Sequence, residues 1–296
     1  MSHRRQKGMA VIGALLVVAA TSVATAAIME RQSLLADTLF GERDRVQAKW
    51  LLRGGLDWAR VILSLDARNN AVTLKNALWA QPIAGLEIET SGGQKRAYFS
   101  GLIEDEQGKY NLSRLATAGE LNAGELARFQ TLLSHLGLPE SLALAITQRV
   151  AGSQVRPGQP ATALGLRTVE DLAAVQGVTP STLAMLSEYL TLLPADVPLN
   201  INTAGAEVLS ASIPGLDLAS ARSMVQERER GMWFTSRGDF LNRLERPELA
   251  RRSRLDVRSD WFKVSGEVRL NQAASSMTAL LHRQGSAPPT LLWIRG

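Results

Sequence analysis

The stretch Lys7-Gly-Met-Ala-Val-Ile-Gly-Ala-Leu-Leu-Val-Val-Ala-Ala20 sets the architecture of this 296-residue chain, because it opens a long apolar segment. No charged residue occurs from Gly8 to Met29. About twenty apolar residues, at a helical rise of about 1.5 Å each, cross a hydrocarbon core of ~30 Å. Residues 9–29 are therefore predicted to span a membrane. The basic residues that precede the segment predict a cytoplasmic N-terminus, with the bulk of the chain on the opposite side.

Three interpretations fit this segment. A secretory signal would be removed after its apolar region, and Ala24-Thr-Ala26 offers a small-residue cleavage site. A signal anchor would stay uncut. A prepilin-type leader would be cut between Gly8 and Met9, where a glycine separates the last basic residue from the apolar stretch, and the stretch would remain on the mature protein.

The sequence after the apolar segment favours the third interpretation. It stays compatible with a helix from Glu30 to about Leu65 and contains no proline there. Apolar and small residues recur at helical spacing on one face, namely Ala48, Leu51, Leu52, Gly55, Ala59, Ile62 and Leu63. A helix from Met9 to Leu65 would be about 85 Å long, half in lipid and half packed on a soluble domain. This is the architecture of pilins. Trp50 and Trp58 share a helix face and are expected in the core.

Gly13 is informative because pilins usually have glutamate at the fifth residue after the cut. A carboxylate inside a bilayer is costly unless it is paired, and in pilins it meets the free amine of the subunit above. A subunit with no neighbour above has no amine to meet. Gly13 therefore argues either against a pilin or for a position at a filament tip.

Strand patterns occur at both ends of the remaining chain. Alternation predicts strands at Leu86–Thr90 and Arg96–Ile103, joined by a turn at Ser91–Gln94. The pattern returns only near the end, at residues 254–259, 261–270, 277–283 and 290–295. Antiparallel strands that begin and end a domain imply an insertion between them.

The predicted insertion is helical and internally repetitive. Periodic apolar segments stop and restart at Gly137, Gly177 and Gly215, which predicts helices over residues 120–136, 139–150, 169–175, 180–193, 204–213 and 218–230. Thr179 before Pro180 is a predicted N-cap, and Thr168 with Asp171 resembles a capping box.

The predicted fold class is α+β, with a pilin-like long N-terminal helix packed on an antiparallel sheet and a large all-helical insertion. Its parts are a leader (1–8), a transmembrane helix (9–29), the helix and hairpin of a pilin domain (30–111), the insertion (112–250) and the C-terminal strands (251–296).

Composition argues against an enzyme. The chain has no cysteine and three histidines, which excludes disulfides and thiolate chemistry and disfavours a histidine metal site or a catalytic triad. The net charge of +5 resides in residues 222–296, which hold fourteen bases and eight acids. These charges alternate in sign, as expected of a solvated face. No catalytic residue and no small-molecule substrate are expected.

Residues 199–230 resemble the helix-hairpin-helix module, which also occurs in competence proteins that hold DNA outside the membrane. Its phosphate grip needs a second glycine two residues after the first, and the residue two positions after Gly215 is Asp217. A carboxylate repels phosphate and suits the N-cap of a helix starting at Leu218. A packing motif is therefore preferred, and a membrane-tethered DNA-binding protein of competence type is the alternative.

Several motifs in succession carry a family resemblance. They are the Gly8/Met9 leader, the long helix, Ile103-Glu-Asp-Glu-Gln-Gly-Lys-Tyr-Asn-Leu112, Asn200-Ile-Asn-Thr-Ala204 and Ser259-Asp-Trp-Phe-Lys-Val264. In this order, over essentially the whole chain, they resemble the K-type minor pseudopilins of the type II secretion system, the general secretion pathway protein K family.

The resemblance implies a prepilin fold with a large helical insertion, anchored in the bacterial inner membrane with its soluble part in the periplasm. It implies that prepilin peptidase removes residues 1–8 and that Met9 is N-methylated. It also implies a place at the pseudopilus tip with the I- and J-type minor pseudopilins. Members of this family lack the usual pilin glutamate, so Gly13 becomes support for the assignment.

No cofactor is expected, although calcium occurs in the family. Relatives often carry an acidic cluster after the second helix of the insertion, whereas residues 147–153 here contain no carboxylate. Glu104, Asp105 and Glu106 are weak substitute metal candidates, and a solvated turn is the preferred interpretation of these three acids.

Overall fold

The structure is a computed structural model that describes residues 3–89, 96–251 and 253–296. The turn predicted at Ser91–Gln94 lies outside the described residues. The chain forms two compact units. The first contains α1 as far as Gly54 together with the described parts of residues 84–100 and 267–276, and the second contains the rest of the chain.

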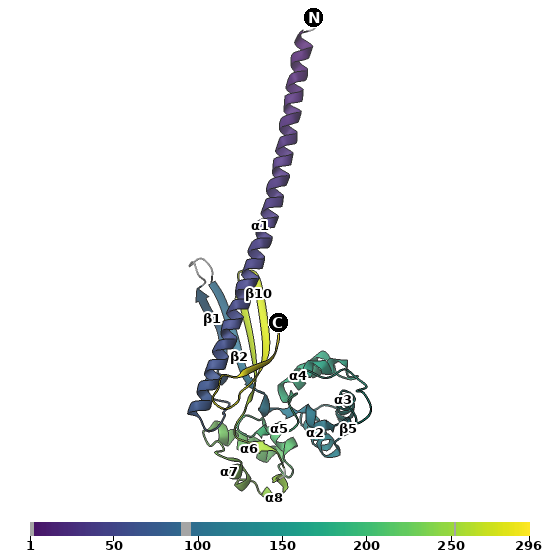
Figure 1. Ribbon diagram of the computed structural model, residues 1–296, viewed down its shortest axis with the longest axis vertical. Helices are drawn as coiled ribbons and strands as arrows, with labels where there is room; N and C mark the ends of the chain where they lie inside the picture. The colour runs from purple at the N-terminus through teal and green to yellow at the C-terminus, as the bar shows by residue number, and fades with distance from the viewer. Residues whose placement is uncertain (1–2, 90–95, 252) are drawn as a thin grey trace. The chain divides into compact units, whose positions relative to one another are not determined.

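Helix α1 runs without interruption from His3 to Asn69 (Figure 1). The prediction of one long helix is confirmed, and the helix extends beyond Leu65 by one turn. Its end is marked by Asn70, whose side-chain amide donates to the Asp66 carboxylate at 2.8 Å. The absence of proline in this segment leaves every backbone N–H after the first turn free to bond within the helix.

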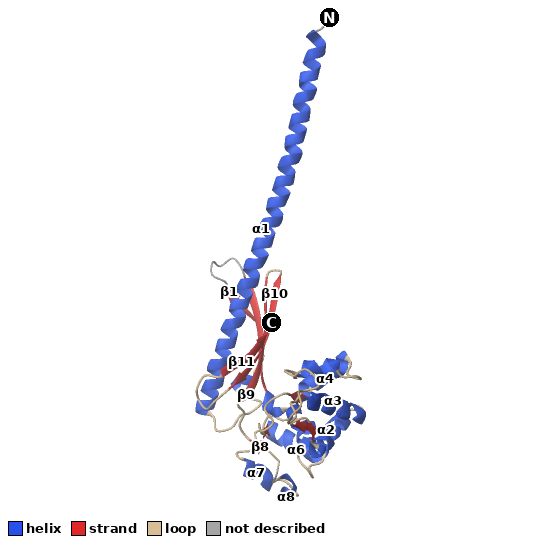
Figure 2. Cartoon of the chain, turned by 45° about the vertical axis from the view of Figure 1, so that its right-hand side comes forward, coloured by secondary structure: helices blue, strands red, loops and turns tan. Residues whose placement is uncertain are grey.

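Within the described residues a five-stranded sheet has the order β1-β2-β9-β10-β11. Its strands are β1 (Ile83–Glu89), β2 (Arg96–Asp105), β9 (Trp261–Leu270), β10 (Ala273–His282) and β11 (Thr290–Arg295). Strands β10 and β11 pair in antiparallel register, with Leu280 opposite Trp293. Because β2 and β9 are neighbours although more than 150 residues separate them, the predicted insertion is confirmed. Figure 2 shows the sheet strands and the mainly helical insertion in different colours.

The helices of the insertion follow the glycine-punctuated pattern. They are α2 (Ala123–His135), α3 (Glu140–Gly152), α4 (Pro180–Tyr189), α5 (Ala206–Ser212), α6 (Leu218–Glu229), α7 (Arg237–Asn242) and α8 (Pro247–Ala250). Short 3-10 helices lie at η1 (Leu78–Ala80), η2 (Glu106–Gly108), η3 (Leu112–Leu115) and η4 (Val169–Ala174). The glycine restarts have a backbone reason, since Gly137, Gly177 and Gly215 all adopt positive φ.

The helix starts follow the predicted capping chemistry. Thr179 accepts from the Thr182 N–H at 3.1 Å at the start of α4. Asp171 accepts from the Thr168 N–H at 3.0 Å, which is half of the predicted capping box.

Three predicted elements need correction. The strand predicted at 254–259 does not join the sheet; its residues Leu255–Asp256 (β8) pair in parallel with β7 (Leu199–Asn200). The helix predicted to Leu193 ends at Tyr189, because the next two residues (β6, Leu190–Thr191) pair in parallel with β3 (Tyr110–Asn111). The segment 169–175 forms the 3-10 helix η4. With the hairpin β4 (Ala116–Thr117) and β5 (Glu120–Leu121), the insertion therefore contains short strand pairs besides its helices.

The soluble half of α1 buries the predicted face, including Ala48, Leu52, Ala59 and Leu63, and also Leu56. The expectation that Trp50 and Trp58 belong to the core is wrong, since they are 71% and 46% exposed. Each lies two positions from a buried leucine, and two residues advance about 200° around a helix. Both indoles therefore lie on the side away from the core.

The insertion has its own apolar core. Its centre is formed by fully buried side chains of several helices, among them Phe129, Leu132, Leu133, Ile146 and Leu209.

Candidate functional site

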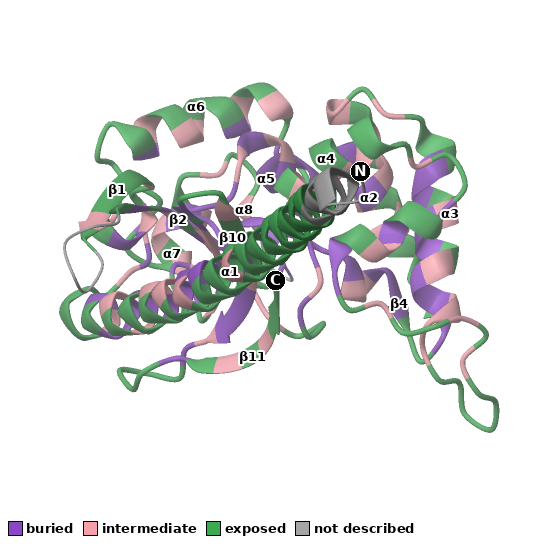
Figure 3. Ribbon diagram, turned by 90° about the horizontal axis from the view of Figure 1, so that it is seen from above, coloured by how far each residue is buried: buried purple, intermediate pink, exposed green. Residues whose placement is uncertain are grey.

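The apolar half of α1, which we define as residues 11–40, is the first candidate site, because none of these described residues is buried. An 18-residue window in this helix has a mean hydropathy of 2.3 and no residue buried (Figure 3). Its large apolar side chains are more than half exposed from Val11, at 59%, to Phe40, at 57%. Among the described residues this is the one helix that is long and apolar enough to cross a membrane.

The hydroxyl side chains within the predicted span of residues 9–29 donate to backbone carbonyls of the helix itself. Ser22 donates to the Val18 carbonyl at 2.8 Å, and Thr25 donates to the Thr21 carbonyl at 2.8 Å. Thr21 donates to the Val17 carbonyl at 3.0 Å. In a hydrocarbon core an unpaired hydroxyl is costly, whereas these three expose no unsatisfied donor. The local chemistry of the helix thus suits lipid as well as water.

The residues predicted for processing lie in the same helix. The helical backbone passes through Gly8 and Met9 without a break. At Gly13 an added Cβ would meet no other atom within 4 Å, so packing within this chain does not require a glycine there. Cleavage after Gly8 and methylation of Met9 stay predictions.

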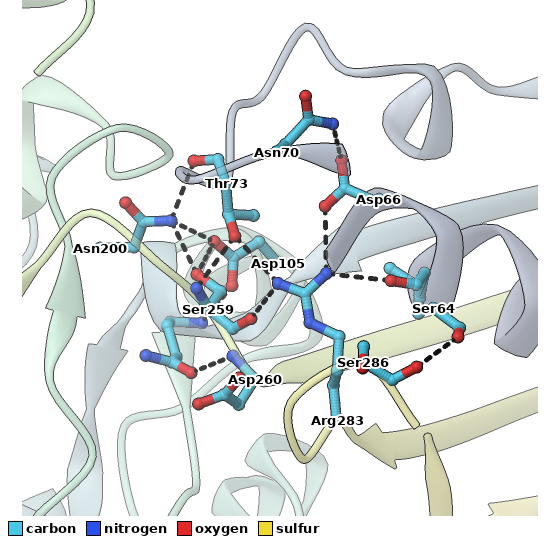
Figure 4. A network of polar contacts seen from close by, with 12 residues as sticks. Ser64, Asp66, Asn70, Thr73, Asp105, Asn200, Ser259, Asp260, Arg283 and Ser286 are labelled. Atoms are coloured by element: carbon cyan, nitrogen blue, oxygen red, sulfur yellow. Dashed lines mark hydrogen bonds and ion pairs between the residues drawn. The ribbon is translucent and has the colours of Figure 1, made fainter. Parts of the chain in front are cut away.

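The second candidate site is a buried polar junction, which we define as Asp66, Thr73, Asp105, Asn200, Thr203, Ser259 and Arg283. Figure 4 labels all of these residues except Thr203. The junction residues lie at or next to the ends of regular elements: Asp66 near the end of α1, Thr73 in the loop after it, Asp105 at the end of β2, Asn200 at the end of β7, Thr203 in the loop after β7, Ser259 just before β9 and Arg283 directly after β10. Each is 9% exposed or less. The junction therefore lies where the chain leaves the sheet for the insertion and where it returns.

Asp105 is the acceptor at the centre of the junction. Its Oδ2 accepts from the Thr203 hydroxyl at 2.5 Å, the Ser259 hydroxyl at 2.6 Å and the Asn200 amide at 3.2 Å. Its Oδ1 accepts from the Gln107 N–H at 2.8 Å. Burial nevertheless raises the pKa of Asp105, because removal from water disfavours the carboxylate more than these donors favour it.

Arg283 is the cation of the junction. Its Nη1 contacts the Asp66 carboxylate at 3.0 Å and the Leu63 carbonyl at 3.1 Å. Its Nη2 donates to the Ser259 carbonyl at 2.5 Å and to the Thr73 hydroxyl at 3.0 Å. The guanidinium also lies over the Phe262 ring at 4.8 Å from its centroid. The Arg283 side chain, directly after β10, thus connects the end of α1 to the residues around the start of β9.

A close backbone contact joins the junction to η2. A Cβ added to Gly108 would lie 2.9 Å from the Thr203 hydroxyl oxygen and 3.0 Å from the Thr203 carbonyl carbon. Glycine is therefore the residue that lets η2 approach the loop after β7.

The expectation that residues 104–106 form a solvated turn is wrong. Glu106 is 6% exposed and its carboxylate pairs with Lys109 at 2.7 Å, while the other oxygen accepts from the Thr191 hydroxyl at 2.6 Å. Glu104 pairs with Lys263 at 2.8 Å and with Lys109 at 3.3 Å. Burial alone would raise the pKa of Glu104, but the two ammonium groups overcome it and lower the pKa. Burial alone would lower the pKa of Lys109, but the Glu106 and Glu104 carboxylates hold it above its usual value.

These contacts bear on the weak metal candidates Glu104, Asp105 and Glu106. Glu104 and Glu106 share Lys109 as a partner, whereas Asp105 accepts from hydroxyl and amide donors. Within the described part of the chain, no group of three or more His, Asp or Glu side chains is arranged to hold a metal ion. A divalent cation would have to displace Lys109 or Lys263.

Sequence reasoning missed most of the junction. Asn200 and Ser259 lie in motifs that carried the family resemblance, although nothing local indicated that they meet at 2.7 Å. Arg283 carried no signal at all. A buried arginine at the end of a strand looks like any surface arginine until its partners are known.

The helix-hairpin-helix segment is formed by α5 and α6. Asp217 caps α6 by accepting from the Ser220 N–H at 2.9 Å, as predicted, so a carboxylate occupies the position where the module would bind phosphate. His135 ends α2, and its Nε2 lies 3.0 Å from the Ser210 hydroxyl of α5. The hairpin therefore packs as part of the insertion core.

Comparisons with known proteins agree on one family. Two family models match, both described as "Type II secretion system (T2SS), protein K", over residues 108–195 and 199–265, together more than half of the chain. The chain is similar to type II secretion system protein K of Pseudomonas aeruginosa, at 26% identity over 95% of this chain and 90% of the relative. It is also similar to type II secretion system protein K of Pectobacterium carotovorum, at 28% identity over 95% and 94%.

A solved structure has the same fold. It is described as the crystal structure of the GspK-GspI-GspJ complex from the type 2 secretion system of enterotoxigenic Escherichia coli. The match has a TM-score of 0.67 and 20% identity, and it covers 86% of this chain and 97% of the other.

Proposed function

The chain belongs to the type II secretion system protein K family, and on that premise we propose that it caps the tip of the pseudopilus and initiates its assembly for protein export across the outer membrane. We expect no catalytic site in a minor pseudopilin, so the proposed function is one of assembly. The single observation that carries the proposal is the exposed apolar half of α1, joined to a part of the chain that has its own buried core.

The anchor argument is energetic. Each large apolar side chain left in water forgoes about 1.5–3 kcal/mol relative to burial, and this helix exposes a long run of them. A bilayer, or the helices of other pseudopilins, would cover that surface. We propose that residues 9–29 lie in the bacterial inner membrane and that the soluble part lies in the periplasm.

The capping argument rests on Gly13 and on the insertion. With Gly13 the helix offers no carboxylate to the amine of a subunit above it, and no packing within the chain requires that glycine. More than 150 residues lie between β2 and β9, most of them in the insertion, and the middle of a thin filament has no room for this bulk. A subunit that blocks further addition above it would be the first subunit of the filament and would remain at its tip.

The I- and J-type minor pseudopilins are the proposed partners. Support comes from the solved relative, whose description names a complex of GspK with GspI and GspJ. Co-purification tests this proposal directly. Tagged full-length chain, extracted in mild detergent, should bring down both partners from cells that express all three. Capture of neither partner would contradict the assignment.

Processing is tested by the mass of the mature N-terminus. Prepilin peptidase is expected to cut after Gly8, so the mature protein should start with N-methylated Met9. A matched Gly8→Leu variant should keep its first eight residues, because the glycine next to the cut is lost. A mature chain that begins at Ala27 would mean that the apolar segment is a secretory signal, and the anchor proposal would fall.

DNA binding is not supported by the hairpin. The Asp217 carboxylate occupies the N-terminus of α6, and Arg222 of the same helix pairs with Glu207 at 3.3 Å. A gel shift at low salt is the measurement that separates the two functions. Retardation that weakens steeply with salt would favour the competence-type alternative.

A further inference from the structure

Arg228 is a buried cation without a buried anion. Its side chain is 5% exposed, in the last turn of α6. Its Nη1 donates to the Ile201 and Ala204 carbonyls, both at 2.8 Å. Among the described residues it forms no ion pair, in contrast to Arg283, whose charge is matched by Asp66. Burial lowers the pKa of Arg228 to about 10, which is the mark of a guanidinium that has lost water and gained no carboxylate.

A cavity adjoins the Arg228 side chain. Arg228 lines a cavity of about 160 Å³, together with Lys75, Asn76, Asn202 and Trp233. A guanidinium has five N–H donors, and the two carbonyls engage only its Nη1. The cavity thus combines unused guanidinium donors and a lysine with an indole wall.

Its size and rim indicate the kind of occupant. Pockets for small molecules and cofactors usually hold about 300–1,000 Å³, so this cavity suits one side chain better than a free metabolite. Trp233 is 39% exposed, and the neighbouring Met232 is 51% exposed. A desolvated arginine beside a partly exposed tryptophan and methionine has the composition of an interface hot spot.

We infer that this cavity is the docking site for the carboxylate of an aspartate or glutamate side chain on a protein partner, with Arg228 and Lys75 as its cationic ligands and Trp233 as its apolar wall. The inference goes beyond tip capping and does not depend on it. A carboxylate would give the buried guanidinium its missing counter-charge, and paired buried ions bind best when the donors are fixed in advance. The two carbonyls already fix the guanidinium.

Glu229 allows a variant that should strengthen carboxylate binding, alongside one that should weaken it. It also lines the cavity, is itself exposed, and is the nearby negative charge that acts on Arg228. Adjacent residues on a helix point about 100° apart, so Glu229 does not form the ion pair that Arg228 lacks. Glu229 should repel an incoming carboxylate. Its removal should therefore strengthen binding, whereas removal of Lys75 should weaken it.

The test uses the full chain in detergent micelles, with N-acetyl-glutamate N-methylamide as the probe and its glutamine analogue as the uncharged control. Binding is followed through the side-chain ¹⁵N–H signal of Arg228, assigned by its loss in Arg228→Lys. The glutamate probe should shift this signal and the glutamine analogue should not. Glu229→Gln should tighten binding about two- to threefold and Lys75→Gln should weaken it by a similar factor, as expected for partly exposed charges.

Each outcome decides the inference. Lys75 and Glu229 are exposed and form no ion pair with other described residues, so their variants should fold as the parent chain does. No glutamate-dependent shift of the Arg228 signal would overturn the proposal and leave Arg228 as a support for the loop after β7. Equal response to the glutamine analogue would also overturn it, and so would weaker binding by Glu229→Gln or tighter binding by Lys75→Gln. Inorganic phosphate provides a further arm, and binding as strong as that of glutamate would mean an unselective anion site.

Discussion

The apolar half of α1 and the polar junction reverse the usual distribution of residues in a soluble protein. In the first, large apolar side chains such as Leu16 and Leu39 are exposed, at 66% and 71%. In the second, the charged side chains of Asp66, Asp105 and Arg283 are buried. The junction satisfies its charges within the chain, whereas the helix leaves its apolar surface uncovered. The first region therefore depends on an environment that the second does not need.

The two regions differ in what stabilises them: the apolar helix needs surroundings that cover it, and the junction needs partners within the chain. An exposed apolar helix loses stabilisation in water in proportion to its area, and lipid or other helices can supply it. A buried ion pair is stable only while both partners stay in place, and nothing outside the chain can replace one of them. Changes in α1 should therefore alter where the protein resides, and changes in the junction should alter whether it folds.

The largest expected effect concerns the apolar half of α1. The double variant Leu15→Arg/Val18→Arg places two charges in the middle of the apolar segment. Each arginine near the centre of a spanning helix costs about 2.5–3.5 kcal/mol of insertion free energy. The variant should be largely lost from the membrane fraction after alkaline carbonate extraction.

Leu39→Arg is the control, because Leu39 is at least as exposed as Leu15 and Val18 but lies beyond the predicted span of residues 9–29. It should stay in the membrane fraction. Retention of the double variant would show that the apolar segment does not hold the protein by inserting in lipid.

The second effect concerns the junction. Arg283→Met keeps roughly the length of the side chain but leaves the Asp66 carboxylate buried without its cation. Removal of one partner from a buried pair costs about 3–5 kcal/mol. Denaturant unfolding of the full chain in detergent should show a loss of this size in the free energy of unfolding.

Arg269→Met provides the exposed counterpart. Arg269 pairs with Glu267 at 2.6 Å, but its side chain is 70% exposed. Its loss should cost less than about 1 kcal/mol. Equal losses for the two variants would remove the distinction between the junction and an ordinary surface ion pair.

The third effect concerns the close approach of backbone to the junction. Gly108→Ala would push a Cβ against Thr203, whose backbone cannot move without disturbing Asp105. Overpacking of this kind costs about 1–3 kcal/mol. Gly165→Ala is the control, since a Cβ at Gly165 meets nothing within 4 Å. Thermal unfolding should separate the two, and an unchanged melting temperature for Gly108→Ala would show that η2 can shift freely.

Local chemistry made much of the fold predictable. The apolar run without proline predicted α1, because a helix satisfies its own backbone in lipid. Strand patterns at both ends of the chain predicted the insertion, and Thr179 and Asp217 predicted helix starts because an N-cap needs only its own neighbours. Each of these features depends on residues a few positions apart.

The failures depend on distant partners or on direction. Three consecutive acids at residues 104–106 indicate a solvated turn unless Lys263, Thr191 and Ser259 are known to surround them. Helical spacing put Trp50 and Trp58 on one face without showing which face meets the sheet. The parallel pair β7 and β8 involves two residues on each side, too few for any alternation to be visible. Arg283 and Arg228 were missed because burial of a charge is decided by the whole fold.

The smallest expected effect sharpens the account of the junction through pH. Burial raises the pKa of Asp105 above 3.8, so between pH 3.8 and the folded-state pKa the unfolded chain has lost this proton while the folded chain keeps it. Unfolding then releases a proton. The contribution of protonated Asp105 to the free energy of unfolding is therefore complete at low pH and declines as pH rises through the folded-state pKa. Asp105→Asn lacks this titration. The free energy of unfolding of the parent chain minus that of the variant should therefore fall as pH rises from about 4, and a difference that grows with pH would mean that the hydrogen bonds to Asp105 outweigh its burial.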